Sequence, residues 1–109
     1  MRGPEKALEL LLYGNLIKAR EALNLGLVNK LVPGEDLDEQ ALAWAAELAQ
    51  KSPVAVRIAK TAFYRSEDLH YEARFAYMNE AFARLCTTQD AKEGVSAFFE
   101  KRPPHWQEK

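Results

Sequence analysis

The sequence has very few of the residues that usually build a metal centre, a disulfide or a nucleophilic site. Its 109 residues include one cysteine, Cys86, and two histidines, His70 and His105. A single cysteine can form neither an internal disulfide nor a cysteine-rich zinc site, and it favours a reducing, cytoplasmic compartment. Neither histidine has a sequence neighbour that would complete a metal site or a nucleophile pair. We therefore expect no metal site and no nucleophilic site in this chain.

Long apolar runs and an excess of basic charge are also missing. The apolar run Leu8–Leu12 is interrupted by Glu9 and is soon followed by Gly14, so no transmembrane span is expected. The first residues, Met1–Lys6, lack the apolar segment of a signal peptide. The formal net charge of −1 argues against a general nucleic-acid binder. We expect neither a membrane nor a nucleic acid as a partner.

Helical periodicity dominates what is present. Hydrophobic residues make up 48% of the chain, enough for one modest core. The apolar spacing predicts a mainly α fold of five to six helices with at most one short strand, about Leu27–Val32. The helices are expected over 3–14, 18–25, 37–51 and 52–65, after Asp68, and from Thr87 to the double proline at Pro103.

Several polar residues are typical of helix starts. Asp36 and Asp68 are expected to cap the helices that follow them. Ser52-Pro53 is an N-cap followed by a first-turn proline, and Thr87 with Asp90 resembles a capping box. The lone strand would need a partner, because one strand cannot make a sheet. That requirement indicates that the chain pairs with a copy of itself or belongs to something larger.

A stripe of large apolar residues marks the helix after Asp68. Spacings of three and four residues separate its members, which are Tyr71, Phe75, Met78, Phe82 and Leu85. We interpret the stripe as a helix–helix seam rather than a ligand groove. The partner helix could lie in the same chain or in another. Cys86, at the end of this helix, is interpreted as a packing residue.

The last helix ends with two aromatic residues followed by two cations. Phe98 and Phe99 precede Lys101 and Arg102, and Pro103 stops the helix. Cations in a last turn stabilise the helix dipole by roughly 0.3–1 kcal/mol and need no ligand. An aromatic face beside a cation would also suit the base and phosphate of a nucleotide. Both interpretations remain open on spacing alone.

Six segments, in order, resemble the C-terminal part of the crotonase superfamily, the enoyl-CoA hydratase/isomerase enzymes. They are Lys6–Gly14, Ala19–Ala22, Gly26–Pro33, Ser52–Val56 with Lys60, Thr88–Gly94 and Ala97–Arg102. The resemblance implies that residues 1–51 are a remnant of the distal edge of the family core and that 52–109 form a C-terminal helical oligomerisation region. It also implies acyl-CoA chemistry, that is, hydration or isomerisation of CoA thioesters as in fatty-acid metabolism.

The resemblance further implies that the family's ββα spiral core, its catalytic glutamates and its oxyanion hole precede this segment. No residue here matches a catalytic residue, so the chain alone is expected to be inactive and to bind no cofactor by itself. Family members assemble as trimers or hexamers, and self-association is expected. Phe98 and Lys101 match positions that reach the adenine and 3′-phosphate of CoA bound to a neighbouring subunit. The alternative is a stand-alone, non-catalytic helical oligomerisation module.

Overall fold

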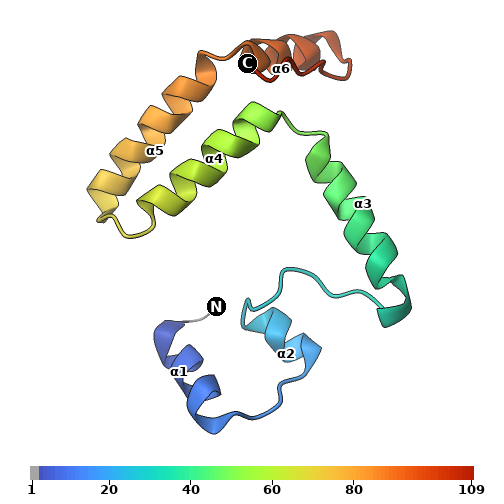
Figure 1. Ribbon diagram of the computed structural model, residues 1–109, viewed down its shortest axis with the longest axis vertical. Helices are drawn as coiled ribbons and strands as arrows, with labels where there is room; N and C mark the ends of the chain where they lie inside the picture. Colours follow the sequence, from blue (N-terminus) through green and yellow to red (C-terminus); the bar gives the residue numbers. More distant parts are fainter. Residues whose placement is uncertain (1–2) are drawn as a thin grey trace. The chain divides into compact units, whose positions relative to one another are not determined.

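The computed structural model describes residues 3–109, and every regular element in that range is helical (Figure 1). The α-helices are separated by short connections, and one 3₁₀ helix precedes α3. This confirms the mainly α prediction and the number of helices. The elements are α1 (Gly3–Tyr13), α2 (Ala19–Asn24), η1 (Gly34–Asp36), α3 (Leu37–Ala49), α4 (Pro53–Ser66), α5 (Tyr71–Cys86) and α6 (Gln89–Glu100).

The strand expected over Leu27–Val32 does not form. Bends and irregular backbone occupy these residues, and no strand occurs anywhere within 3–109. The alternation of apolar residues is present, but a strand is stable only when a neighbouring strand supplies its hydrogen bonds. The described residues contain no second strand that could supply them.

The chain divides into two compact units, Met1–Ala43 and Trp44–Lys109, and the boundary falls inside α3. In the first unit, α1 and α2 end at glycines with positive φ, Gly14 (63°) and Gly26 (76°). Glycine adopts this left-handed conformation without the steric cost that other residues incur. The predicted functional division between residues 51 and 52 concerns the family core and stays a prediction.

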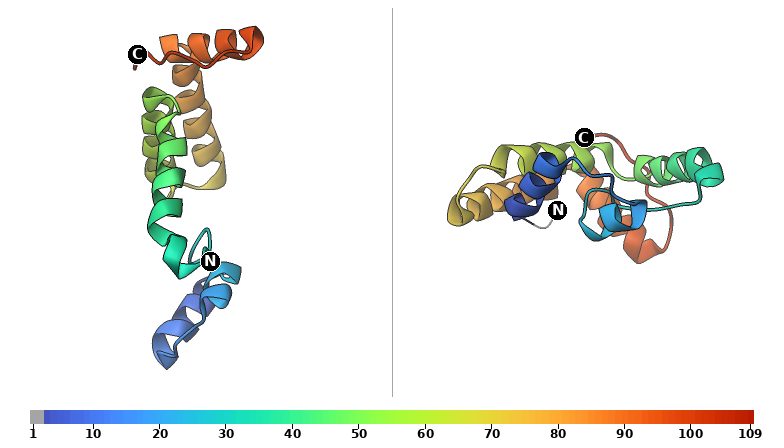
Figure 2. Two further views of the ribbon diagram at one scale, coloured as in Figure 1. Left: turned by 90° about the vertical axis from the view of Figure 1, so that its right-hand side faces the viewer. Right: turned by 90° about the horizontal axis from the view of Figure 1, so that it is seen from below.

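In the second unit, α4 and α5 form an antiparallel helical hairpin, and α6 lies across one end of it (Figures 1 and 2). Small buried side chains allow the close approach: Ala62 and Ser66 on α4, and Ala81 on α5. Arg74 closes the hairpin turn by donating from Nε to the Ser66 carbonyl at 2.9 Å. The small buried core of this unit sits along the hairpin.

One predicted helix start is confirmed in detail. Ser52 Oγ accepts a hydrogen bond from the Ala55 amide at 3.2 Å, and Pro53 is the first residue of α4. This arrangement satisfies one of the free amides of the first turn, while proline has no amide to satisfy.

The other predicted caps are displaced or absent. The residue that caps α6 is Thr88, whose Oγ1 accepts from the Ala91 amide at 3.1 Å, so the prediction of Thr87 was wrong by one residue. Thr87 instead donates to the Arg84 carbonyl at the end of α5. The N-cap of α5 is His70, which makes no side-chain capping bond, rather than Asp68. Asp36 is the last residue of η1 and directly precedes α3, so its predicted capping of α3 stays a prediction.

Most of the stripe on α5 is exposed. The exposed fractions are 80% for Tyr71, 59% for Phe75 and 66% for Phe82, whereas Leu85 is half-buried. The α4–α5 contact uses the small residues together with Met78, whose Sδ accepts from Ser66 Oγ at 3.7 Å. Most of the stripe therefore lies outside the seam between these two helices. Cys86 is also exposed, which contradicts its interpretation as a packing residue.

Candidate functional site

The end of α6 carries the two residues predicted to contact CoA. Phe98 is 78% exposed, and its ring meets that of Phe99 edge to face at a centroid distance of 5.7 Å. Lys101 is exposed one turn later, with its amide donating to the Phe98 carbonyl at 3.3 Å. The structure thus presents an aromatic ring and an ammonium group from adjacent turns. We call Phe98 and Lys101 the aromatic–cation end.

Lys101 adopts the left-handed conformation, with φ 53° and ψ 44°. The amide of Arg102 then donates to the Ala97 carbonyl at 3.0 Å, and this pair of bonds closes the helix as a Schellman motif. Glycine is the usual residue at such a position, because a left-handed conformation costs any other residue about 1–2 kcal/mol. A lysine here stores backbone strain beside a candidate binding group.

Arg102 is not available for a ligand. Its guanidinium donates from Nη1 to Glu93 Oε1 at 2.5 Å and from Nη2 to Glu93 Oε2 at 3.2 Å, and Nε donates to Glu100 Oε2 at 2.6 Å. A bidentate bond of this kind fixes the guanidinium plane. Lys101 is therefore the one cation of this helix end with no ion pair in the described range, 3–109.

Glu93 is more strongly held than any other carboxylate described. The bond from Arg102 and a second bond from the His105 amide (2.8 Å) lower the pKa of Glu93 from 4.5 to about 2. Both donors stabilise the ionised carboxylate. The same contacts raise the pKa of Arg102 above its ordinary value. We call Glu93, Arg102 and the His105 amide the Glu93 clamp.

The C-terminal tail, Pro103–Lys109, runs back along α6 (Figure 2). Trp106 Nε1 donates to the Gln50 carbonyl at 2.7 Å, and a methyl group at Gly94 would lie 3.4 Å from the Trp106 ring. This is an ordinary van der Waals distance, so the indole packs directly over Gly94. The tail is anchored at both ends of α6.

Asp90 is the most buried polar residue described, at 1% exposure, and it joins three segments. Its Oδ2 accepts from Ser52 Oγ at 2.8 Å, and its Oδ1 accepts from the Gln107 amide at 2.6 Å. Its own amide donates to the Lys109 carbonyl at 3.1 Å. Sequence reasoning placed Asp90 in a capping box and missed this role, because its partners lie far away along the chain.

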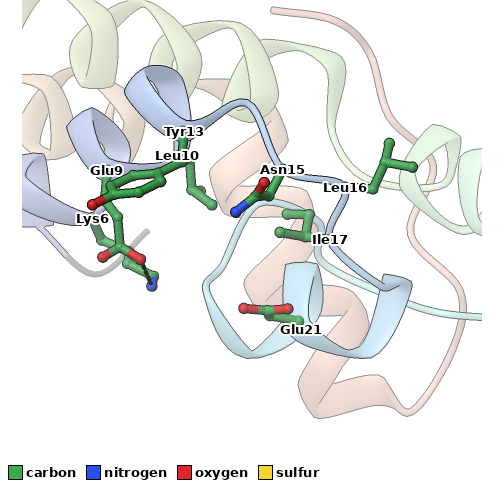
Figure 3. Close-up of a pocket in the computed structure, with 8 residues that line it drawn as sticks. All are labelled: Lys6, Glu9, Leu10, Tyr13, Asn15, Leu16, Ile17 and Glu21. Carbon is green, nitrogen blue, oxygen red and sulfur yellow. Dashed lines mark hydrogen bonds and ion pairs between the residues drawn. The ribbon is translucent and has the colours of Figure 1, made fainter.

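A separate hollow of about 600 Å³ lies in the first unit, between α1 and α2 (Figure 3). Tyr13 and Ile17 contribute apolar surface to it, and Glu21 lines it from α2. Lys6 Nζ pairs with Glu9 Oε1 at 2.8 Å, and this hydrogen bond raises the pKa of Lys6. The charged groups of the hollow thus bind one another, which suits a structural role rather than acid–base catalysis.

Within residues 3–109, no group of three or more His, Cys, Asp or Glu side chains could hold a metal ion. The hydrogen bond from His105 to Glu93 uses the backbone amide of His105. No helix of the described range is long and apolar enough to cross a bilayer.

Comparison with known proteins gives one consistent result. Residues 2–109 match the Enoyl-CoA hydratase/isomerase family. The 2,3-dehydroadipyl-CoA hydratase of Escherichia coli is 36% identical over 102 residues, covering 94% of this chain and 40% of that protein. The short-chain-enoyl-CoA hydratase of Clostridium acetobutylicum is 37% identical, covering 92% of this chain and 38% of its own length. The chain thus spans about two fifths of the length of the relatives it matches.

Solved structures agree with the sequences. The enoyl-CoA hydratase of Mycobacterium smegmatis superimposes with a TM-score of 0.89 at 36% identity, covering 95% of this chain and 40% of that one. The enoyl-CoA hydratase of Bacillus anthracis gives the same TM-score, at 35% identity and with the same coverage. The fold, the sequence and the matched range all lead to one assignment: the chain belongs to the enoyl-CoA hydratase/isomerase family.

Proposed function

We propose that this chain is the C-terminal portion of an enoyl-CoA hydratase/isomerase and that it contributes to oligomerisation and to part of a CoA site. The matched relatives are about two and a half times longer, which leaves room for a core carrying the catalytic groups. On this proposal the whole protein adds water to a CoA thioester or shifts its double bond. This chain alone lacks the oxyanion hole, which is usually the largest contribution to such catalysis.

The aromatic–cation end is the observation that supports the CoA contact. Phe98 offers an exposed ring for the adenine, and Lys101 offers an unpaired ammonium for the 3′-phosphate. Arg102 cannot take that part, because Glu93 and Glu100 already occupy its guanidinium. Lys101 is then the cation that remains beside the exposed Phe98 ring, a combination that suits the base and phosphate of a nucleotide.

CoA and dephospho-CoA differ only in the 3′-phosphate, so together they test the Lys101 contact. In the longer protein that the proposal assumes, CoA should bind more tightly than dephospho-CoA, as measured by isothermal titration calorimetry. Lys101→Ala should abolish that preference, because the ammonium is the group assigned to the 3′-phosphate. Lys92→Ala, which removes an exposed cation from the first turn of α6, should keep it.

Equal affinity of the unaltered longer protein for the two ligands would contradict the assignment of Lys101. A crotonyl-CoA hydration assay tests the other half of the proposal. The purified chain should give no turnover, and measurable turnover would show that catalytic groups are present in it.

The exposed stripe on α5 favours a second candidate, a non-catalytic helical module that only assembles with copies or partners. Tyr71, Phe75 and Phe82 would then serve as the contact surface. Under this alternative Lys101→Ala would leave the affinities of the longer protein for CoA and dephospho-CoA unchanged, whereas association would persist. The titration therefore separates the two functions.

A further inference from the structure

The strain at Lys101 requires a source of stabilisation nearby. A non-glycine residue keeps a left-handed backbone only where its surroundings determine that conformation. The side chain of Lys101 makes no hydrogen bond or ion pair in the described range, so it does not hold itself in place. What fixes Lys101 must act through the residues on either side of it.

A single carboxylate holds the chain directly after Lys101. Glu93 accepts two bonds from the Arg102 guanidinium, at 2.5 and 3.2 Å, and one from the His105 amide at 2.8 Å. Since Glu93 lies within α6, these bonds tie the residues that leave the helix back onto the helix itself. The chain can satisfy them only if it reverses direction at Lys101.

Glu100 contacts the same guanidinium but is a weaker anchor. It accepts one bond from Arg102, at 2.6 Å, and its side chain is 59% exposed, against 21% for Glu93. It bonds no atom of the tail in the described residues. The two glutamates thus form a matched pair, in which only Glu93 links the helix, Arg102 and His105.

We propose that Glu93 is the positioning residue for Lys101: its carboxylate, through Arg102 and the His105 amide, keeps Lys101 left-handed and so fixes where the ammonium is presented. This inference rests on the proposed CoA contact for its purpose. It assigns Glu93 a role without any contact to the ligand, because its oxygens are already occupied by protein donors. A glycine at position 101 would remove the backbone strain, but it would also remove the ammonium group. The Glu93 clamp therefore allows a lysine to stand where a glycine would be usual.

Glu93→Gln tests the clamp and Glu100→Gln is its control. The readout is hydrogen exchange of the Arg102 amide, whose bond to the Ala97 carbonyl exists only when Lys101 is left-handed. Glu93→Gln should speed that exchange about tenfold, whereas Glu100→Gln should leave it nearly unchanged. The same variant should lose the preference for CoA over dephospho-CoA. Equal exchange rates in the unaltered chain and in Glu93→Gln would overturn the proposal.

A glycine rescue separates positioning from general loosening of the tail. Glycine adopts the left-handed conformation freely, so Lys101→Gly should restore slow Arg102 exchange in the Glu93→Gln background. Failure of that rescue would show that Glu93 acts on the whole tail and not on Lys101, and would overturn the proposal. If the unaltered longer protein lacks any preference for CoA over dephospho-CoA, the CoA contact fails, while the exchange rates still decide the role of Glu93.

Discussion

At the residue scale, the side chain that matters most for the stability of the second unit is Asp90, which has no part in the proposed CoA contact. Asp90 is buried at 1% exposure and satisfies the Ser52 hydroxyl and the Gln107 amide with its two oxygens. A buried carboxylate is tolerated only when its oxygens are hydrogen-bonded. Asp90 therefore fixes the start of α4, the start of α6 and the end of the tail relative to one another.

Asp90→Ala should lower the free energy of unfolding by about 2 kcal/mol, because it leaves the buried Ser52 hydroxyl and the part-buried Gln107 amide without their acceptor. Urea denaturation followed by far-UV circular dichroism measures this. Asp68→Ala removes an exposed carboxylate and should change the free energy of unfolding by less than about 0.5 kcal/mol. A loss from Asp90→Ala as small as that of the control would show that the three segments hold together without the carboxylate.

At the scale of elements, the helices were predictable because their signals are local. Ser52-Pro53 starts α4 where expected, since the cap and the proline act within one turn. The predicted cap of α6 was wrong by one residue, because two adjacent threonines could each have capped the helix. Thr87 instead donates to the last turn of α5, and Thr88 caps α6. The Glu93 clamp and the Trp106 contact were not predictable, because their partners lie 9 to 56 residues away along the chain.

The attachment of the tail to α6 should depend on pH through Glu93. Its pKa falls from 4.5 to about 2 on folding, so the folded state favours the ionised carboxylate. The stabilisation is fully present above pH 4.5 and is lost as the pH falls through about 2. The unaltered chain should thus lose stability over this window, while Glu93→Gln should lose less because Gln cannot titrate.

The indole N–H signal of Trp106 reports tail release directly, since that group bonds the Gln50 carbonyl. Urea denaturation at several pH values gives the matching free energies of unfolding. Glu100→Gln, which leaves the clamp in place, should follow the unaltered chain. Identical pH profiles for the unaltered chain and Glu93→Gln would show that the clamp contributes nothing to this titration.

At the scale of the whole molecule, the chain exposes far more large apolar side chains than it buries. Its buried apolar residues are Leu25 and three alanines, whereas phenylalanines and tyrosines remain exposed on α4, α5 and α6. A monomer rarely leaves contiguous apolar patches larger than a few hundred Å² in water. The chain spans about two fifths of the length of the relatives it matches. On the proposal that it is a portion of such a protein, the remaining portion would cover these surfaces.

Bare apolar faces on the described helices should drive the purified chain to associate with itself. Phe82→Glu places a charge in the exposed stripe of α5 and should shift the population toward the single-chain mass of 12.4 kDa, because burying an unpaired carboxylate at an interface is costly. Light scattering over a concentration series measures the shift. Glu80→Gln changes a neighbouring exposed residue on the same helix without adding charge to the stripe, and it should associate as the unaltered chain does. A single 12.4 kDa species for the unaltered chain at every concentration would show that these faces do not bind one another. Association that persists in Phe82→Glu would place the contact on the aromatic surfaces of α4 or α6 instead.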